Sequence, residues 1–239
     1  MFTRRIFPLL IPLTIAAWVA LVRYPVSFGL IRLAVVTLGV LIVGQVLAAI
    51  WPWRLIRASL LGVLLLFAGF LTLPGRNEVS RAELAETYLI QLRSFQAVPY
   101  VWGGENYQGI DCSGLVRRAW AEALLLHGVQ HLNPASVRAA FSMWWHDLSA
   151  KALRDEARGL TVRRFEARSI NEVEPARLSP GDLAATQDGV HVMAYLGEKL
   201  WIEADPGADR VIIKQAPSPR NPWFAAPVVI LQWKELTVP

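Results

Sequence analysis

Hydrophobic residues fill three long stretches in the first third of the chain, at positions 6–22, 33–53 and 58–74. A bilayer core about 30 Å thick is crossed by roughly 17–25 helical residues, and a helix satisfies its own backbone hydrogen bonds there. Three successive runs argue against a single cleaved signal peptide, which has one short apolar region. We therefore expect residues 1–74 to form an α-helical membrane segment with three transmembrane helices, a hairpin of two being the alternative.

Beyond this segment the apolar positions recur at helical spacing. Three helices are predicted, each from its own signal: a Ser-x-x-Glu capping box, apolar residues spaced three and four apart, and an Asn-Pro start. They are expected at 80–96, from Ser113 to about Gly128, and from Asn133 to about Leu153. The glycine at 128 is expected to end the second helix at its C′ position.

From residue 159 onward the pattern changes to short segments rich in β-branched and aromatic residues, separated by Gly, Pro and Asp. Six such segments predict strands: LTVRRFEA, GDLAAT, GVHVMAYLG, KLWIEAD, RVIIKQ and VVILQW. Helices first and strands afterwards is the pattern of an α+β domain with a mostly antiparallel sheet. We expect residues 75–239 to form this domain, which is long enough to bury one core.

Charge is distributed unevenly between the two parts. Residues 1–74 contain six arginines and no Asp or Glu, so 75–239 holds all 19 acidic residues and 24 − 6 = 18 basic ones. The domain is therefore nearly neutral, at 18 − 19 = −1, and the basic pI of about 9.7 comes from the apolar segment. A nucleic-acid partner requires a basic face on the folded domain, so this class of function is disfavoured.

The same arginines bear on membrane orientation. With three spans and a cytoplasmic N-terminus, four of them lie inside and two outside, in the sense of the positive-inside rule. The four are Arg4, Arg5, Arg54 and Arg57, and the two are Arg23 and Arg32. This orientation predicts a multi-pass protein of the cell (inner) membrane with residues 75–239 on the periplasmic or extracellular side.

The single cysteine of the chain, Cys112, follows a glycine-rich loop and opens the second predicted helix of the domain. A helix N-terminus carries unpaired N–H groups and a partial positive charge, which stabilise a thiolate and can hold an oxyanion. Asp111, directly before it, is suited to cap the helix. A lone cysteine cannot form an internal disulfide, so this thiol is either a small buried apolar group or a nucleophile.

A nucleophilic thiol needs a base, and the chain has four histidines. His127 and His131 lie at a helix end and His146 lies beside two tryptophans in a helical stretch, so we expect these three to be structural or solvated. His191 lies in a predicted strand whose opposite face is apolar. An imidazole on that sheet face can pack against the helix start that bears Cys112, which makes His191 the candidate base.

A catalytic imidazole also needs a partner that orients its far nitrogen, and two acids follow in the next predicted strand. Residues 197–199 predict a hairpin turn. A three-residue loop places Asp205 directly across from His191 and Glu203 diagonally across, both on the histidine's face. A two-residue loop places both acids on the opposite face. The sequence leaves Glu203 and Asp205 as rival partners.

These segments together resemble a known family. The motifs PYVWGG…DCSGLV, PGDLAAT and HVMAYLG…LWIEA, within residues 82–205, are similar to those of the NlpC-type cell-wall peptidases, a papain-like group of cysteine peptidases. The resemblance implies a papain-like domain with helices packed on an antiparallel sheet. It makes Cys112 the nucleophile and His191 the base. It also makes Glu203 the third polar residue, with Tyr100 contributing near the oxyanion site.

Two features depart from the family pattern. The third position is often His and here is Glu203, but a carboxylate orients an imidazole at least as well. The separation between Cys112 and His191, 191 − 112 = 79 residues, is longer than the family leads us to expect. We therefore expect an insertion at about 130–170 that reshapes the substrate groove.

The resemblance implies a membrane-anchored cysteine hydrolase that cuts an amide bond in peptidoglycan stem peptides, typically after γ-D-glutamate, without a metal or cofactor. The alternatives are a thiol acyltransferase or an amidase acting on another small substrate, and a catalytically silent wall-binding module. The scattered histidines also lack the spacing of metal ligands. The expected partners are a peptidoglycan peptide and the lipid bilayer, and the sequence identifies no protein partner.

Overall fold

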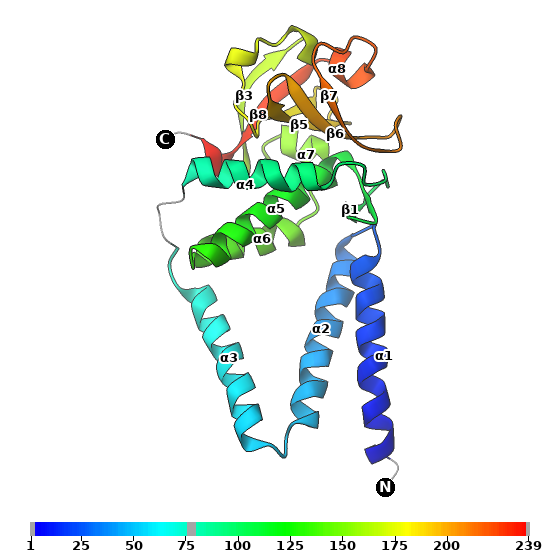
Figure 1. Ribbon diagram of the computed structural model, residues 1–239, viewed down its shortest axis with the longest axis vertical. Coiled ribbons are helices and arrows are strands. Elements are labelled where there is room, and N and C mark those ends of the chain that lie inside the picture. The colour runs from blue at the N-terminus through cyan, green and yellow to red at the C-terminus, as the bar shows by residue number, and fades with distance from the viewer. Residues whose placement is uncertain (1–2, 76–79, 238–239) are drawn as a thin grey trace.

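The computed structural model describes the backbone of residues 3–75 and 80–237, and side chains from residue 10 onward within those ranges. Three long helices stand on one side of an α+β domain (Figure 1). They are α1 (Thr3–Arg23), α2 (Gly29–Ala49) and α3 (Arg54–Thr72). Helices α1 and α2 run antiparallel and pack along each other, whereas α3 stands apart and meets the domain at α6 (Pro134–Trp145).

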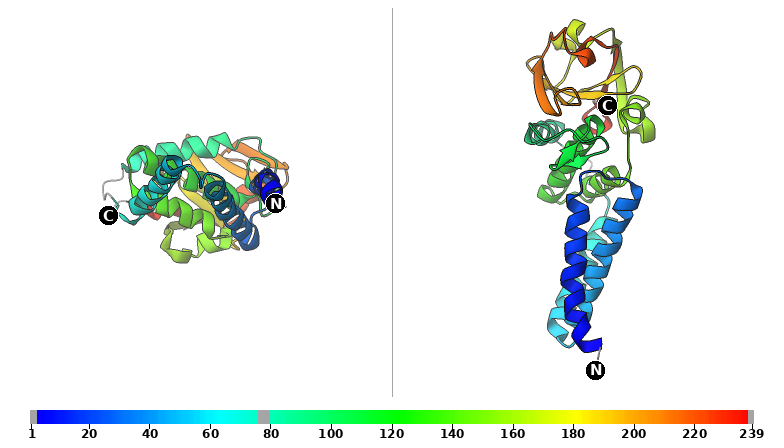
Figure 2. Two further views of the ribbon diagram at one scale, coloured as in Figure 1. Left: turned by 90° about the horizontal axis from the view of Figure 1, so that it is seen from below. Right: turned by 90° about the vertical axis from the view of Figure 1, so that its right-hand side faces the viewer.

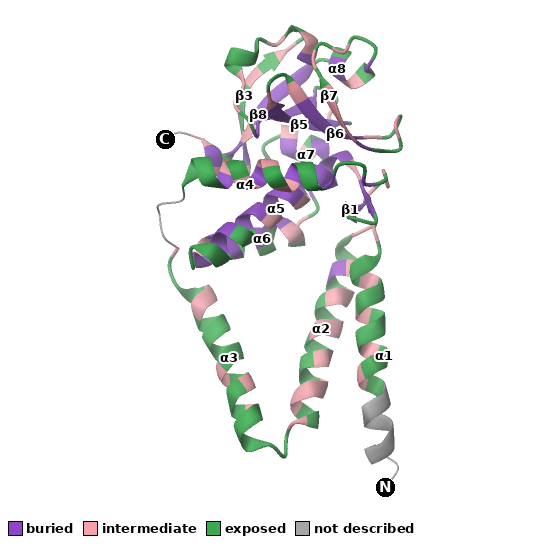
Figure 3. Cartoon of the chain, viewed as in Figure 1, coloured by how far each residue is buried: buried purple, intermediate pink, exposed green. Residues whose placement is uncertain are grey.

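Two of these helices, α2 and α3, are long and apolar enough to cross a membrane, whereas the described apolar part of α1, Leu10–Arg23, is shorter. The 21 residues of α2 span about 31 Å at 1.5 Å per residue, which matches a bilayer core. Their apolar side chains are largely exposed (Figure 3), with Leu55 at 85% and Leu66 at 76%. An exposed apolar surface of this kind is typical of a membrane-facing or protein-binding surface. That any of the three helices spans a membrane stays a prediction.

The domain contains the predicted helices and all six predicted strands. The helices are α4 (Arg81–Ser94), α5 (Cys112–Gln130), α6, α7 (Ala150–Arg154) and α8 (Pro222–Ala225), with short 3₁₀ turns at Ala157–Gly159, Ile170–Glu172, Pro175–Arg177 and Lys234–Leu236. The strands of the main sheet are β3 (Thr161–Ala167), β4 (Leu183–Thr186), β5 (Val192–Gly197), β6 (Leu200–Asp205), β7 (Arg210–Gln215) and β8 (Val228–Trp233). A small hairpin of β1 (Glu105–Asn106) and β2 (Gly109–Ile110) precedes α5.

The six strands form one antiparallel sheet in the order β3-β8-β4-β5-β6-β7. Helices α4 and α5 cover one face, so the side view in Figure 2 shows a helical layer between the sheet and the long helices. This interface is the main core, where the rings of Trp120 and Trp233 stack at 5.1 Å and Tyr88 meets Trp120 edge-on at 5.2 Å. The other sheet face packs a second apolar cluster that includes Phe224 of α8. The α+β prediction is confirmed.

Helix α5 does not end at Gly128, as predicted, but continues to Gln130. The glycine serves helix packing instead of termination: a Cβ atom there would lie 2.6 Å from the Val137 side chain and 2.8 Å from its backbone nitrogen. Only a residue without a side chain lets α5 and α6 approach this closely.

The predicted helix from Asn133 to Leu153 is also wrong in extent, because it breaks into α6 and α7. The break frees two carbonyl groups, and arginines from elsewhere in the chain bind them: Arg32 donates to Trp145 O and Arg117 to His146 O, both at 3.2 Å. Ser149 then caps the new helix through the N–H of Ala152 at 3.2 Å. Long-range hydrogen bonds therefore override the local helical pattern.

The β5–β6 hairpin combines features of the two predicted registers. Its turn has two residues, Glu198 and Lys199, both at positive φ. An irregularity between Tyr195 and Gly197 then shifts the register by one residue. As a result Tyr195 pairs with Trp201 and Ala194 with Ile202, which is the register predicted for a three-residue loop. The prediction that His191 lies within a strand is wrong, because β5 begins one residue later, at Val192.

Candidate functional site

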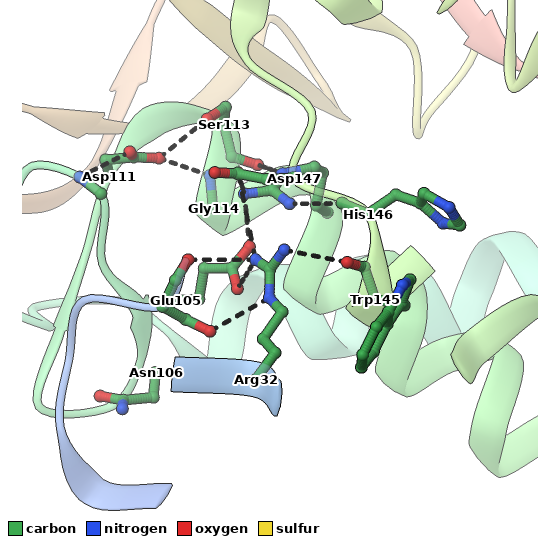
Figure 4. Close-up of polar contacts among 12 residues, drawn as sticks. Arg32, Glu105, Asn106, Asp111, Ser113, Gly114, Trp145, His146 and Asp147 are labelled. Carbon is green, nitrogen blue, oxygen red and sulfur yellow. Dashed lines mark hydrogen bonds and ion pairs between the residues drawn. The ribbon is translucent and has the colours of Figure 1, made fainter. Parts of the chain in front are cut away.

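Cys112 is the first residue of α5, and Asp111 is its N-cap, as predicted. The Oδ1 atom of Asp111 accepts hydrogen bonds from the Gly114 N–H at 2.5 Å and the Ser113 hydroxyl at 3.0 Å (Figure 4). Its Oδ2 atom accepts from the Gly103 N–H at 2.9 Å. Helix geometry leaves the N–H groups of the first two residues, Cys112 and Ser113, without a carbonyl acceptor inside the helix. The thiol therefore lies beside free backbone donors.

Glycines in the preceding loop allow the backbone to fold tightly against this helix start. Gly103 has φ +74°, a conformation that L side chains rarely adopt. A Cβ atom on Gly104 would lie 2.5 Å from the carbonyl oxygen of Gly109 and 2.8 Å from that of Val101. The carbonyl of Gly104 in turn accepts from the Asp111 N–H at 3.1 Å. The loop thus fixes the position of the N-cap.

His191 lies at the end of a tight turn that begins at Thr186. The Thr186 N–H donates to the His191 carbonyl at 2.9 Å, and the His191 N–H donates to the Thr186 hydroxyl at 3.0 Å. The imidazole Nε2 atom lies 3.0 Å from Glu203 Oε2 on the adjacent strand β6. The Cys112 Sγ atom lies 3.9 Å from the carbonyl oxygen of Val190, the residue before His191, and the thiol raises the pKa of the His191 ring. The structure therefore brings Cys112, His191 and Glu203 together.

Burial alone would lower the pKa of His191, but hydrogen bonds to Cys112 and Glu203, and the charges of those two groups, outweigh it and raise the pKa to about 9. The side chains of His191 and Glu203 are 2% and 0% exposed. At neutral pH the imidazole is therefore mostly protonated and can balance a neighbouring thiolate.

Two residues of the site were not predicted from the sequence. The Nδ2 group of Asn221 donates to Glu203 Oε1 at 2.6 Å, so both carboxylate oxygens of Glu203 are bound. The Trp223 ring stacks on the imidazole of His191 with centroids 4.2 Å apart and an interplanar angle of 17°. Asn221 is also the N-cap of α8, through the Trp223 N–H at 2.9 Å. The one sequence signal for this region was the Asn221-Pro222 pair, which is typical of a helix start.

Tyr100, half-buried, lines the same cavity as Cys112. Burial and the neighbouring charges of Cys112 and Asp111 raise the pKa of its phenol to about 12. The hydroxyl therefore keeps its proton near neutral pH and can act as a hydrogen-bond donor toward this cavity.

The remaining candidates lie apart from this cluster. Asp205 binds its own turn, with Oδ1 accepting from the Gly207 N–H at 2.8 Å. His127 contacts the Ser136 hydroxyl, His131 pairs with Glu83, and His146 binds the Ser142 carbonyl. Among the residues that the structure describes, no group of three or more His, Cys, Asp or Glu is arranged to hold a metal ion.

Cys112 and His191 open into a cavity of about 610 Å³. Its lining includes Tyr100, Trp102, Gly103, Gly189, Val190, Pro206 and Trp223. The segment 147–152 and, from outside the domain, residues 26–28 between α1 and α2 complete the lining. The cavity therefore offers a groove large enough for a short peptide above the thiol.

Residues 97–225 match the model of the NlpC/P60 family, which covers more than half of the chain. A curated protein, dipeptidyl-peptidase 6 of Lysinibacillus sphaericus, is 30% identical over 118 residues, which are 49% of this chain and 31% of that protein. The match thus spans about a third of the length of this relative.

Solved structures of similar proteins include the peptidoglycan hydrolase RipB of Mycobacterium tuberculosis, 21% identical with a TM-score of 0.40 over 64% of this chain and 65% of that one. NlpC1 of Trichomonas vaginalis is 15% identical with a TM-score of 0.41 over 66% of this chain and 46% of that one.

Proposed function

Because the chain belongs to the NlpC/P60 family, we propose that it is a membrane-anchored cysteine hydrolase that cuts an amide bond in the stem peptides of peptidoglycan. The observation that carries the proposal is the imidazole of His191, which binds Glu203 through Nε2 and lines the same open groove as Cys112. A buried carboxylate that binds Nε2 leaves Nδ1 for the thiol. This is the arrangement of a nucleophile, a base and an orienting group.

In the first half of the reaction, the Cys112 thiolate attacks the amide carbonyl carbon, and the carbonyl oxygen becomes an oxyanion. The N–H groups at the start of α5 and the protonated phenol of Tyr100 stabilise this charge. When the C–N bond breaks, protonated His191 gives its proton to the leaving amine. A thioester on Cys112 and a neutral imidazole remain.

In the second half, neutral His191 takes a proton from water while the water oxygen attacks the thioester carbonyl. Collapse of this intermediate releases the carboxylic acid and returns the thiolate beside a protonated imidazole. Glu203 holds the ring in one orientation through both halves, and Asn221 holds Glu203. No external oxidant, reductant or cofactor is needed.

We assign residues 1–74 to anchoring and 75–239 to catalysis, with three spans and the catalytic domain on the periplasmic or extracellular side. The path of the chain supports this orientation, because the α1–α2 connection lies at the domain end of the helices and the α2–α3 connection at the far end (Figure 1). We also propose an insertion at about 130–170. Its support is that Asp147, Ser149, Ala150 and Ala152 line the groove.

The full-length protein in detergent, incubated with soluble disaccharide–stem peptides, tests this function. We expect mass spectrometry to find two new fragments whose masses sum to that of the substrate plus one water, and to find none with Cys112→Ala. Transfer of the acyl group to an added amine in place of water would favour the acyltransferase. Binding of the peptides without any cleavage would identify a silent wall-binding module.

A further inference from the structure

The connection between α1 and α2 pairs with the loop that leads to Cys112. The Ser27 N–H donates to Gly103 O at 3.2 Å, and the Glu105 N–H donates to Pro25 O at 2.9 Å. Val26 and Gly104 form an antiparallel bridge between these bonds. Residues 24–28, which we call the anchor loop, therefore add a short strand to the catalytic domain.

Side chains of the anchor loop contribute directly to the cavity above Cys112. Val26, Ser27 and Phe28 all line it. Phe28 is 45% exposed and Trp102, across the junction in the catalytic domain, is 83% exposed, so both rings have surface available for a ligand. The groove is thus built from two parts of the chain that are more than 70 residues apart in sequence.

Arg32, in the first turns of α2, fixes the anchor loop to the domain. Its side chain is 1% exposed, and its Nη2 atom lies 2.6 Å from Glu105 Oε2 (Figure 4). The guanidinium also donates to the Ser27 hydroxyl and to the Ser27 carbonyl, both at 3.2 Å. One side chain from a predicted membrane helix therefore holds the loop on one side and the catalytic domain on the other.

The ion pair continues to the helix that carries the thiol. The second oxygen of Glu105 pairs with Arg117 of α5, whose guanidinium also donates to Asp147 Oδ1 at 3.1 Å. The Nε group of Arg117 donates to Ser113 O at 3.3 Å, one residue after Cys112. Two arginines and two acids make this cluster neutral. Removing one of its members would leave a buried charge uncompensated.

We infer that the anchor loop is a substrate-binding wall of the catalytic groove and that Arg32 is the positioning residue that holds it there. The inference rests on the proposed function and deepens it: peptide substrates contact the membrane segment itself while they are cut. Val26 and Phe28 supply an apolar surface for the substrate, whereas the Cys112–His191 chemistry is independent of them. The anchor therefore takes part in recognition as well as in tethering.

The test uses the full-length protein in detergent and separates recognition from chemistry. Phe28→Ala removes an exposed ring, and Arg32→Gln removes the charge that holds the loop. Leu30→Ala is the matched control, because Leu30 is 71% exposed on α2 and does not line the groove. Binding of a soluble disaccharide–stem peptide is measured in a Cys112→Ala background, and KM and kcat are measured with the thiol present.

We expect Phe28→Ala and Arg32→Gln each to weaken binding and raise KM roughly tenfold, with kcat and the Cys112 alkylation rate changed less than about twofold. Arg32→Lys should recover part of the loss, and Leu30→Ala should bind as the parent does. Unchanged binding and KM in both variants would overturn the inference while leaving the hydrolase intact. If both variants bound the peptide more weakly but the parent protein cut no peptide, the proposed hydrolase activity would be rejected and the role of the anchor loop in binding would stand.

Discussion

The Nε2 atom of His191 lies 3.0 Å from Oε2 of Glu203, and the two side chains are almost completely buried. The ring is therefore fixed by a group that carries the opposite charge, while its other nitrogen is left for Cys112. Because Asn221 binds the second oxygen of Glu203, the carboxylate cannot rotate without losing a buried hydrogen bond. The basicity of His191 and its orientation have the same structural source.

This relationship predicts the pH dependence of the reaction. The pKa of His191 is raised from 6.5 to about 9, so the imidazolium is present below that pH and is lost as the pH rises through it. We expect kcat to fall above about pH 9. Glu203→Gln removes one cause of the raised pKa, so the fall should begin at lower pH, and kcat should drop roughly 100-fold. Initial rates between pH 6 and 10.5 measure both effects.

Asp205→Asn is the control for this experiment, because Asp205 binds its own turn and not the imidazole. Its alkaline limit should coincide with that of the parent. An unchanged limit in Glu203→Gln, or a shift of equal size in Asp205→Asn, would contradict the assignment of Glu203 as the orienting residue.

Trp223 should affect turnover more than substrate binding. Its ring stacks on His191 at 4.2 Å and limits both the motion and the hydration of the imidazole. We expect Trp223→Ala to reduce kcat about tenfold with KM changed less than about threefold, and Trp223→Phe to keep most of the activity. An equal loss of kcat in the two variants would show that stacking of an aromatic ring on His191 does not support turnover.

Gly104 should be intolerant of any side chain. The Cβ atom of Gly104→Ala would meet backbone atoms of Gly109 and Val101, which cannot move without displacing the loop before Cys112. We expect a loss of about 1–3 kcal/mol in stability, measured as a lower thermal unfolding midpoint of the full chain in detergent. Gly62→Ala in α3 is the control, since its Cβ atom would meet nothing within 4 Å. A Gly104→Ala midpoint as high as that of Gly62→Ala would refute the steric argument.

The strands and the Cys112 helix start could be predicted from the sequence because local signals specify them: alternation, turn residues and an N-cap. The choice between Glu203 and Asp205 could not, because a register that places one acid on the histidine's face places both there, and their contacts with Gly207 and Asn221 separate them. Whether either acid reaches that face depends in turn on an irregularity near Leu196 that shifts the hairpin register after a two-residue turn. A one-residue slip exchanges the two faces of a strand, and no local propensity determines it.

Long-range contacts account for the other differences. Arg32 was assigned to a membrane flank, but its partners are Glu105 and the carbonyl of Trp145, which lie 73 and 113 positions away. Those contacts also break the helix predicted beyond Trp145. Asn221 and Trp223 follow His191 by 30 and 32 residues, and the fold brings Asn221 to Glu203 and Trp223 to the His191 ring (221 − 191 = 30; 223 − 191 = 32). Such long-range contacts cannot be predicted from the spacing of residues along the sequence.

The rate at which iodoacetamide alkylates Cys112 in the full-length protein tests the central claim, a thiolate held by His191, most directly. The account predicts alkylation at pH 7 at least about tenfold faster than that of a free cysteine, because only the thiolate reacts. His191→Ala should slow the reaction by roughly the same factor, while Asp205→Asn should not. Alkylation no faster than that of free cysteine, and unaffected by His191→Ala, would contradict the account.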